Sequence, residues 1–155
     1  MLAQLALASG MVVVVVIMHL VGLALLVRAL RTHYRILRRI QTTPLLILIG
    51  ASLGLFALHT LEIWLYAALY LFLGAVGHFE EALYFSTVTY ATIGYGDVLL
   101  PPDWRILGAI EGATGIIMLG WSTAFLVSLL SQLRLLSHDW LSTVDAHVAA
   151  DGDAK

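Results

Sequence analysis

The chain has 155 residues, of which 61% are hydrophobic and 12% charged, and its mean hydropathy is +0.95. Soluble globular domains are about 45–50% apolar and about 25% charged, so the composition excludes a soluble domain and predicts an integral membrane protein. The formal net charge of −2 gives no support for a nucleic-acid partner, and the absence of cysteine excludes a disulfide framework and a thiolate metal site.

The first apolar segment covers residues 5–27 and holds no charged residue. As a helix it reaches about 35 Å, enough to cross a bilayer core of about 30 Å. We therefore assign residues 1–30 to an N-terminal transmembrane helix. A signal peptide is the alternative, but it needs a basic leading region, and no Lys or Arg precedes Arg28. His19 lies inside this span and is expected to hydrogen-bond a neighbour.

Basic residues gather after this span, where five of the eight Lys and Arg residues lie: Arg28, Arg31, Arg35, Arg38 and Arg39. Basic residues beside a span mark the cytoplasmic side, so the N-terminus is expected outside and residues 31–44 form a basic cytoplasmic linker. The spacing is similar to that of a voltage-sensing helix, but such a helix needs counter-charged neighbours. We instead expect a basic helical extension on the lipid headgroups, with contact to anionic lipid at four of these residues: Arg31, Arg35, Arg38 and Arg39.

The second apolar segment follows Pro44 and is expected to form an outer helix over residues 45–73. His59 and Glu62 are three residues apart and share one face of this helix. Ionisable groups at membrane depth must face protein or water. Small residues in the cytoplasmic half predict a close helix–helix contact; they are Gly50, Ala51, Ser52, Gly54 and Ala57.

A short extracellular turn leads to a short helix expected at residues 81–91. Glu80 and Glu81 at its start are favoured by the helix dipole, and attraction of cations is a second role that they can fill. The C-terminal end of the helix carries partial negative charge and points toward the middle of the membrane, where it helps to hold a cation.

Six residues follow this helix: Thr92, Ile93, Gly94, Tyr95, Gly96 and Asp97. The two glycines lack a Cβ and can take positive φ, so alternating them with larger residues lets successive carbonyls point the same way. Rings of such carbonyls can replace the hydration shell of a cation. The six residues, between two apolar spans, resemble the selectivity filter of potassium-channel pore domains. The resemblance covers residues 45–135 and is to the small bacterial-type form.

The resemblance implies an all-α membrane protein with three transmembrane helices, a re-entrant pore helix and a filter loop at residues 92–97. It implies a four-fold homotetramer, because each chain carries one filter. It implies K+ as the permeant ion, without an organic cofactor, bound by Thr92, Ile93, Gly94, Tyr95 and Gly96, with the ion sites at the first four. It also implies a multi-pass protein of the plasma membrane, the inner membrane in a bacterium, with a cytoplasmic C-terminus.

The residues behind the filter depart from the family pattern. Some bacterial members have Glu where Val88 stands, and many relatives have a Trp pair where Tyr84 and Phe85 stand. We expect these three residues and Asp97 to support the filter, with the Tyr84 hydroxyl bonded to Asp97. Tyr95 is expected to pack behind the filter against the pore helix.

The third apolar segment is expected to form the inner helix over residues 104–135, before a short cytoplasmic tail at residues 136–155. Gly115 and Gly120 resemble the glycine pattern of relatives whose inner helix bends at a hinge. The alternative is that these glycines only permit close packing. Phe125 is expected to help close the inner mouth as a hydrophobic constriction.

Glu111 lies in the outer half of the inner helix, at a depth comparable with that of Glu62. We expect His59, Glu62 and Glu111 to form one buried polar cluster behind the pore. The cluster is either a proton sensor or a structural pairing without a role in gating. One His and one Glu fall short of a metal site, so an enzyme is not expected.

The predicted function is passive, potassium-selective conduction. One alternative is a weakly selective Na+/K+ channel, against which the intact Tyr95 and Asp97 argue. A second is a non-conducting modulatory membrane subunit, which has no need of a complete filter.

Overall fold

The computed structural model of the chain describes residues 2–37 and 43–133. Within these residues it contains α-helices and one short 3-10 turn, and no strand. The helices are α1 (Leu2–Leu37), α2 (Thr43–Phe72), α3 (Phe79–Tyr90) and α4 (Arg105–Gln132), and the 3-10 turn η1 (Pro102–Trp104) directly precedes α4.

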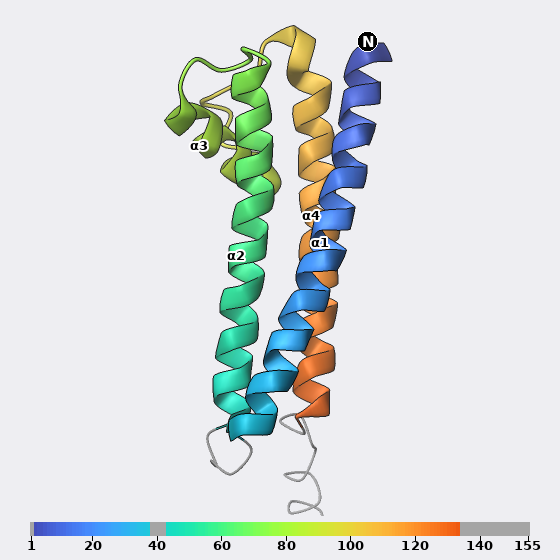
Figure 1. Cartoon of the computed structure of the whole chain (residues 1–155). Helices are drawn as coiled ribbons and strands as arrows, with labels where there is room; N and C mark the ends of the chain where they lie inside the picture. Colours follow the sequence, from blue (N-terminus) through green and yellow to red (C-terminus); the bar gives the residue numbers. More distant parts are fainter. Residues whose placement is uncertain (1, 38–42, 134–155) are drawn as a thin grey trace, which may run out of the picture.

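Three segments are long and apolar enough to cross a membrane: Leu2–Thr32, Pro44–Phe72 and Pro102–Gln132. Lipid offers no partner to backbone amides, so these segments form helices, which pair the amides internally. α1, α2 and α4 run side by side, and α1 packs against both of the others (Figure 1). The protein is therefore an all-α, multi-pass membrane protein, as its composition predicts.

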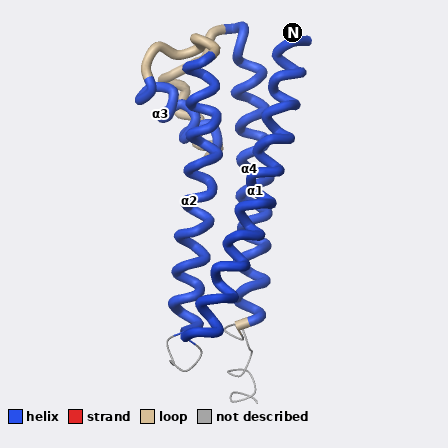
Figure 2. The backbone as a smooth tube through the Cα atoms, viewed as in Figure 1, coloured by secondary structure: helices blue, strands red, loops and turns tan. Residues whose placement is uncertain are grey.

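The short helix α3 packs against α2 and α4 at the end of the bundle that holds the N-terminus (Figure 2). It has 12 residues and so reaches about 18 Å, less than the thickness of a bilayer core. Loops on both sides of α3 connect it to α2 and α4 at this same end. The helix thus enters the bundle without crossing it.

Small residues bring α1 and α2 together. A Cβ at Gly22 would lie 2.4 Å from Leu58 Cδ1, and a Cβ at Gly54 would lie 2.5 Å from Leu26 Cδ1. The close contact predicted for the small residues of the second span is confirmed at Gly54. Its partner is α1, the helix that the resemblance to potassium channels does not cover.

Helix α1 continues past residue 30 to Leu37, so the first part of the expected linker is helical. No Gly or Pro interrupts residues 28–37, and most of their side chains favour helix. Residues 38–42 and the expected tail lie outside the described residues. Three of the four side chains expected to contact lipid are outside the description as well: Arg35, Arg38 and Arg39.

Candidate functional site

Residues 92–97, which we call the filter motif, are hydrogen-bonded to the C-terminal turn of α3. The carbonyl of Val88 accepts two hydrogen bonds, from the N–H of Ile93 at 2.9 Å and from the N–H of Gly94 at 3.2 Å. The N–H of Thr92 donates to the carbonyl of Thr89 at 3.0 Å. These bonds use carbonyls that a helix end leaves without helical partners. The start of the motif is therefore held in a fixed position relative to α3.

The backbone of the motif alternates in handedness. Thr92, Gly94 and Gly96 have φ of 59°, 60° and 77°, whereas φ is negative at Ile93 and Tyr95. Such alternation turns successive carbonyls toward one side of the chain. The glycines were expected to take positive φ, but Thr92 was not. A β-branched residue in this region is an outlier, and outliers of this kind cluster at ligand-binding sites.

One face of the motif is uncovered within a single chain. The side chains of Ile93 and Tyr95 are 52% and 70% exposed. Among the described residues of a single chain, Tyr95 therefore does not pack against α3, so its expected contact with a pore helix is not made within one chain. Non-helical backbone in a membrane is tolerated only where protein or water covers it.

The predicted hydrogen bond between Tyr84 and Asp97 is present. The Tyr84 hydroxyl donates to Asp97 Oδ2 at 2.6 Å, and the N–H of Val98 donates to Asp97 Oδ1 at 3.1 Å. The bond from Tyr84 lowers the pKa of Asp97 and raises the pKa of Tyr84. Both shifts favour a pair in which the carboxylate is ionised and the phenol keeps its proton. Phe85 and Val88 line a small open pocket of about 160 Å³ between α3 and the motif.

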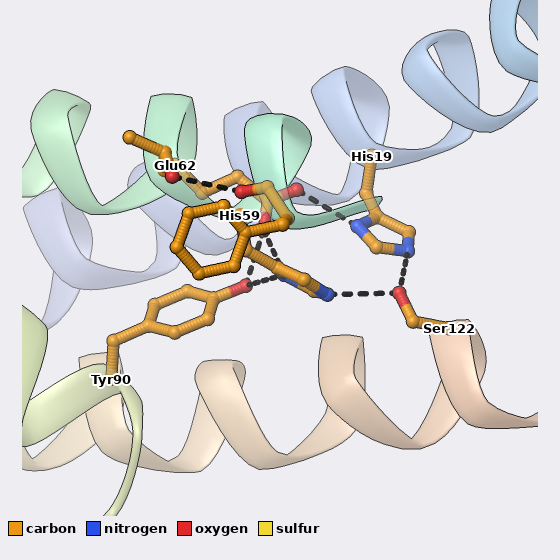
Figure 3. Close-up of polar contacts among 7 residues, drawn as sticks. His19, His59, Glu62, Tyr90 and Ser122 are labelled. Atoms are coloured by element: carbon orange, nitrogen blue, oxygen red, sulfur yellow. Dashed lines mark hydrogen bonds and ion pairs between the residues drawn. The ribbon is translucent and has the colours of Figure 1, made fainter. Parts of the chain in front are cut away.

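A buried polar group joins all four helices (Figure 3). Glu62 Oε1 lies 2.8 Å from His19 Nδ1, and Glu62 Oε2 lies 3.1 Å from His59 Nδ1 and accepts a hydrogen bond from the Tyr90 hydroxyl. Ser122 Oγ lies 2.9 Å from His59 Nε2 and 3.5 Å from His19 Nε2. We call these five residues the His19 cluster. They come from α1, α2, α3 and α4, so the cluster ties the whole bundle together.

Glu111 forms a separate group of hydrogen bonds. It accepts from the hydroxyls of Tyr70 and Ser86, each at 2.5 Å. The prediction that Glu111 shares one cluster with His59 and Glu62 is therefore wrong, although both carboxyl groups are fully buried.

The reason for the separation lies in α3, which packs against both helices that carry these carboxyls. Its hydroxyls are divided between them: Ser86 donates to Glu111 on α4, and Tyr90, one turn later, donates to Glu62 on α2. Each carboxyl thus finds its own partners.

Residues 58–132 match the family described as ion channel. This segment of the chain belongs to the ion-channel family. It begins within α2 and ends at the last residue of α4, and it agrees with the resemblance to potassium-channel pore domains. Neither the curated proteins nor the solved structures compared with the chain gave a match.

Four residues of the His19 cluster lie within the matched ion-channel segment and one lies outside it. His59, Glu62, Tyr90 and Ser122 lie within it, whereas His19 lies in α1. A histidine in an otherwise uncharged apolar span is a signal for such a role. Tyr90 and Ser122 were missed, because single hydroxyl groups in apolar helices carry no comparable signal.

Gly115 of the ion-channel domain lies where α4 crosses the end of α3. A Cβ at Gly115 would lie 2.1 Å from the carbonyl oxygen of Tyr90. α4 is a single helix from Arg105 to Gln132 and passes through Gly115 and Gly120 without a break. Close packing is therefore the role that the structure supports for Gly115. Gly120 has no heavy atom within 4 Å of an added Cβ and makes no such contact.

Phe125 lies on the side of α4 that faces α1. It lines an open pocket of about 250 Å³ together with Leu129 of α4, and with Val27 and Arg31 of α1. It continues the buried face of α4 rather than the exposed one. The structure therefore does not place Phe125 on the face of the ion-channel domain that the bundle leaves open.

Proposed function

We propose that this ion channel is potassium-selective and that residues 92–96 of each chain bind K+ along the pore. The observation that carries the proposal is the alternation of φ along these residues, because it directs consecutive carbonyls to one side. Carbonyl oxygens in rings replace the water around K+. The sites are formed by Thr92, Ile93, Gly94 and Tyr95, and K+ itself is the only bound species that conduction needs.

The pore is completed by four copies of the chain. This assembly is supported by the exposure of Ile93 and Tyr95 in one chain, since exposed loop residues inside a membrane need a protein cover. Four-fold symmetry gives each carbonyl three equivalents around one axis. The C-terminal end of α3, with its partial negative charge, then faces the cavity below the filter from four sides.

The exposed face of α4 lines the cavity in this proposal. It carries Ile116, Gly120, Thr123 and Val127, which follow one another at intervals of three and four residues and are exposed in the single chain. Thr123 gives this wall a hydroxyl, and Val127 is the apolar residue nearest the inner end. A constriction at the inner mouth is therefore expected at Val127 rather than at Phe125.

The channel is placed in the plasma membrane with the N-terminus outside and the C-terminus in the cytoplasm. The support is the excess of arginine at one end of the bundle: Arg28 and Arg31 lie near the inner end of α1, against a single Arg105 at the start of α4. Arg31 is exposed and is proposed to contact anionic lipid headgroups.

The test is the reversal potential of the purified protein in planar bilayers, with K+ on one side and Na+ on the other. A K+-selective filter gives a reversal potential close to the equilibrium potential of K+. A reversal potential near zero would favour the weakly selective channel. No current from the wild-type protein, at any voltage, would favour the modulatory subunit.

A further inference from the structure

Three metal-ligating side chains meet inside the His19 cluster. His19 Nδ1 and His59 Nδ1 each lie within about 3 Å of a carboxylate oxygen of Glu62, at 2.8 and 3.1 Å. One ligand atom from each of the three residues lies within 4.8 Å of the other two. His59 and Glu62 are neighbours on α2, and the packing of α1 adds His19 (Figure 3). The sequence offers His59 and Glu62 as two candidate metal ligands, and the fold adds His19 as a third.

The group is buried, and its charge needs a partner. The side chains of His19 and Glu62 are 0% exposed, and that of His59 is 12% exposed. An ionised carboxylate at this depth is costly unless a positive charge balances it. Its bonded neighbours are two imidazoles and the hydroxyl of Tyr90, and none of these is permanently charged. The balancing charge is therefore a proton on an imidazole or a bound cation.

Ser122 orients both imidazoles from the far side. Its Oγ lies 2.9 Å from His59 Nε2 and 3.5 Å from His19 Nε2, and a hydroxyl oxygen can accept from two N–H groups. When both Nε2 atoms carry protons and both Nδ1 atoms have given theirs up, the Nδ1 lone pairs face the carboxylate of Glu62 and are free to bind an ion. Histidines that bind metal ions are held in this way by a hydrogen bond at the second ring nitrogen.

We propose that His19, His59 and Glu62 form a binding site for a transition-metal ion of the Zn2+ type. Two imidazoles and one carboxylate are an established zinc ligand set, which leaves a fourth position for water. Bonds of about 2.0–2.1 Å in tetrahedral geometry place ligand atoms about 3.3 Å apart, so shifts of roughly 1.5 Å or less suffice. Any proton on either Nδ1 leaves to solvent as the ion enters, because the ligands bind in their deprotonated forms.

The site gives α1 a role that the matched segment does not include. The ion fastens α1 to α2 next to Tyr90, which is the last residue of α3 before the filter loop, and next to Ser122 of α4. The ion therefore sits where all four helices meet. The site does not depend on which cation the pore conducts.

The test uses the purified full chain in detergent, first stripped of metal with a chelator. Zn2+ is titrated by calorimetry and Co2+ by visible absorption, which distinguishes tetrahedral from octahedral coordination. We expect saturation at one high-affinity ion per chain and a tetrahedral Co2+ spectrum. His19→Gln is expected to weaken binding at least tenfold. His19→Cys is expected to restore it, because thiolate binds zinc and the chain has no other cysteine.

His78→Gln is the matched control, because His78 is exposed on the loop before α3 and lies outside the cluster. It is expected to bind Zn2+ as tightly as the wild type. The proposal is overturned if the wild type shows no saturable binding or an octahedral Co2+ spectrum, or if His19→Gln binds as tightly as the wild type. If His19→Gln does not elute as the wild-type assembly, His59→Gln takes its place, and the wild-type titration decides alone if neither folds. Since no current is measured, failure here leaves the proposed K+ conduction untouched.

Discussion

The filter motif and the His19 cluster are built in opposite ways. The motif is six consecutive residues hydrogen-bonded to one helix, and all six are exposed in a single chain. The cluster draws five residues from positions 19 to 122, and it is closed within a single chain. A site made of consecutive residues is visible in the sequence, and its residues are exposed in a single chain. A site made of distant residues can be predicted only in part from the sequence but is complete once the helices pack.

Removing the left-handed backbone of the motif should have the largest effect. Gly94 has φ of 60°, where an L side chain costs about 1–2 kcal/mol, so Gly94→Ala is expected to turn its carbonyl away and to reduce K+ current at least tenfold. The measurement is macroscopic current in planar bilayers.

Gly74→Ala is the matched control for this change. Gly74 has φ of 64°, and an added Cβ meets no heavy atom within 4 Å, as at Gly94. It lies in the loop before α3, so its current should stay near that of the wild type. Equal losses in both variants would mean that general strain, and not the filter, causes the effect.

A methyl group between α4 and α3 should be the next most damaging. Gly115→Ala places a Cβ 2.1 Å from the backbone carbonyl of Tyr90, and backbone cannot swing aside as a side chain can. We expect a loss of about 1–3 kcal/mol of stability, as in overpacked cores, measured as a fall in the thermal unfolding midpoint in detergent. Gly120→Ala is the control, and an equal fall there would contradict the packing role of Gly115.

Removing the charge of the His19 cluster should also lower stability. Glu62→Gln weakens bonds to His19, His59 and Tyr90, and hydrogen bonds to a charged group contribute about 1.5–3 kcal/mol. Thermal unfolding should therefore begin at a lower temperature than in the wild type. Glu80→Gln, an exposed acid in the first turn of α3, is the control and should unfold almost as the wild type does.

The Tyr84–Asp97 bond should change pH dependence more than stability, because both side chains are exposed. The pKa of Asp97 is below its ordinary value of 3.8, so the bond contributes above that value and is lost as pH falls through the lowered pKa. The pKa of Tyr84 is above its ordinary value of 10.0, so the bond is fully present below that value and is lost as pH rises through the raised pKa. The bond is therefore intact across neutral pH.

Tyr84→Phe removes the donor and returns the pKa of Asp97 toward its ordinary value. We expect the variant to lose K+ selectivity or to inactivate faster at neutral pH, and to lose current at a less acidic external pH than the wild type. Bilayer currents recorded while the external side is acidified check both effects. Identical titration curves for variant and wild type would show that the bond does not steady the filter.

Much of the fold follows from hydropathy and local signals. Three apolar stretches of sufficient length predict three spans, and the short segment before the motif predicts α3 within about two residues. The first transmembrane span is predicted to end near residue 30, and α1 continues past it to Leu37 as the expected basic helical extension. The charge pattern marks where a membrane ends, not where a helix does.

The candidate sites were predicted unequally. The bond between Tyr84 and Asp97 is predicted because these two residues stand at positions that support the filter in potassium channels, and the bond is present. The grouping of Glu111 with Glu62 came from equal depth alone, and depth does not say which helix stands between two side chains. The positive φ at Thr92 was also missed, because nothing in a threonine marks a left-handed backbone.

Composition and order along the chain were enough to establish an all-α membrane protein and to locate the six-residue motif at residues 92–97, because apolar length and consecutive residues are local properties. The rotation of each helix about its own axis is not local. The packing of the helices against one another fixes that rotation. As a result His19 contacts Glu62, Ser86 donates a hydrogen bond to Glu111, and Phe125 lies on the side of α4 that faces α1. Polar side chains inside a membrane have no water to hydrogen-bond with, so each must find its partner on the helix that faces it.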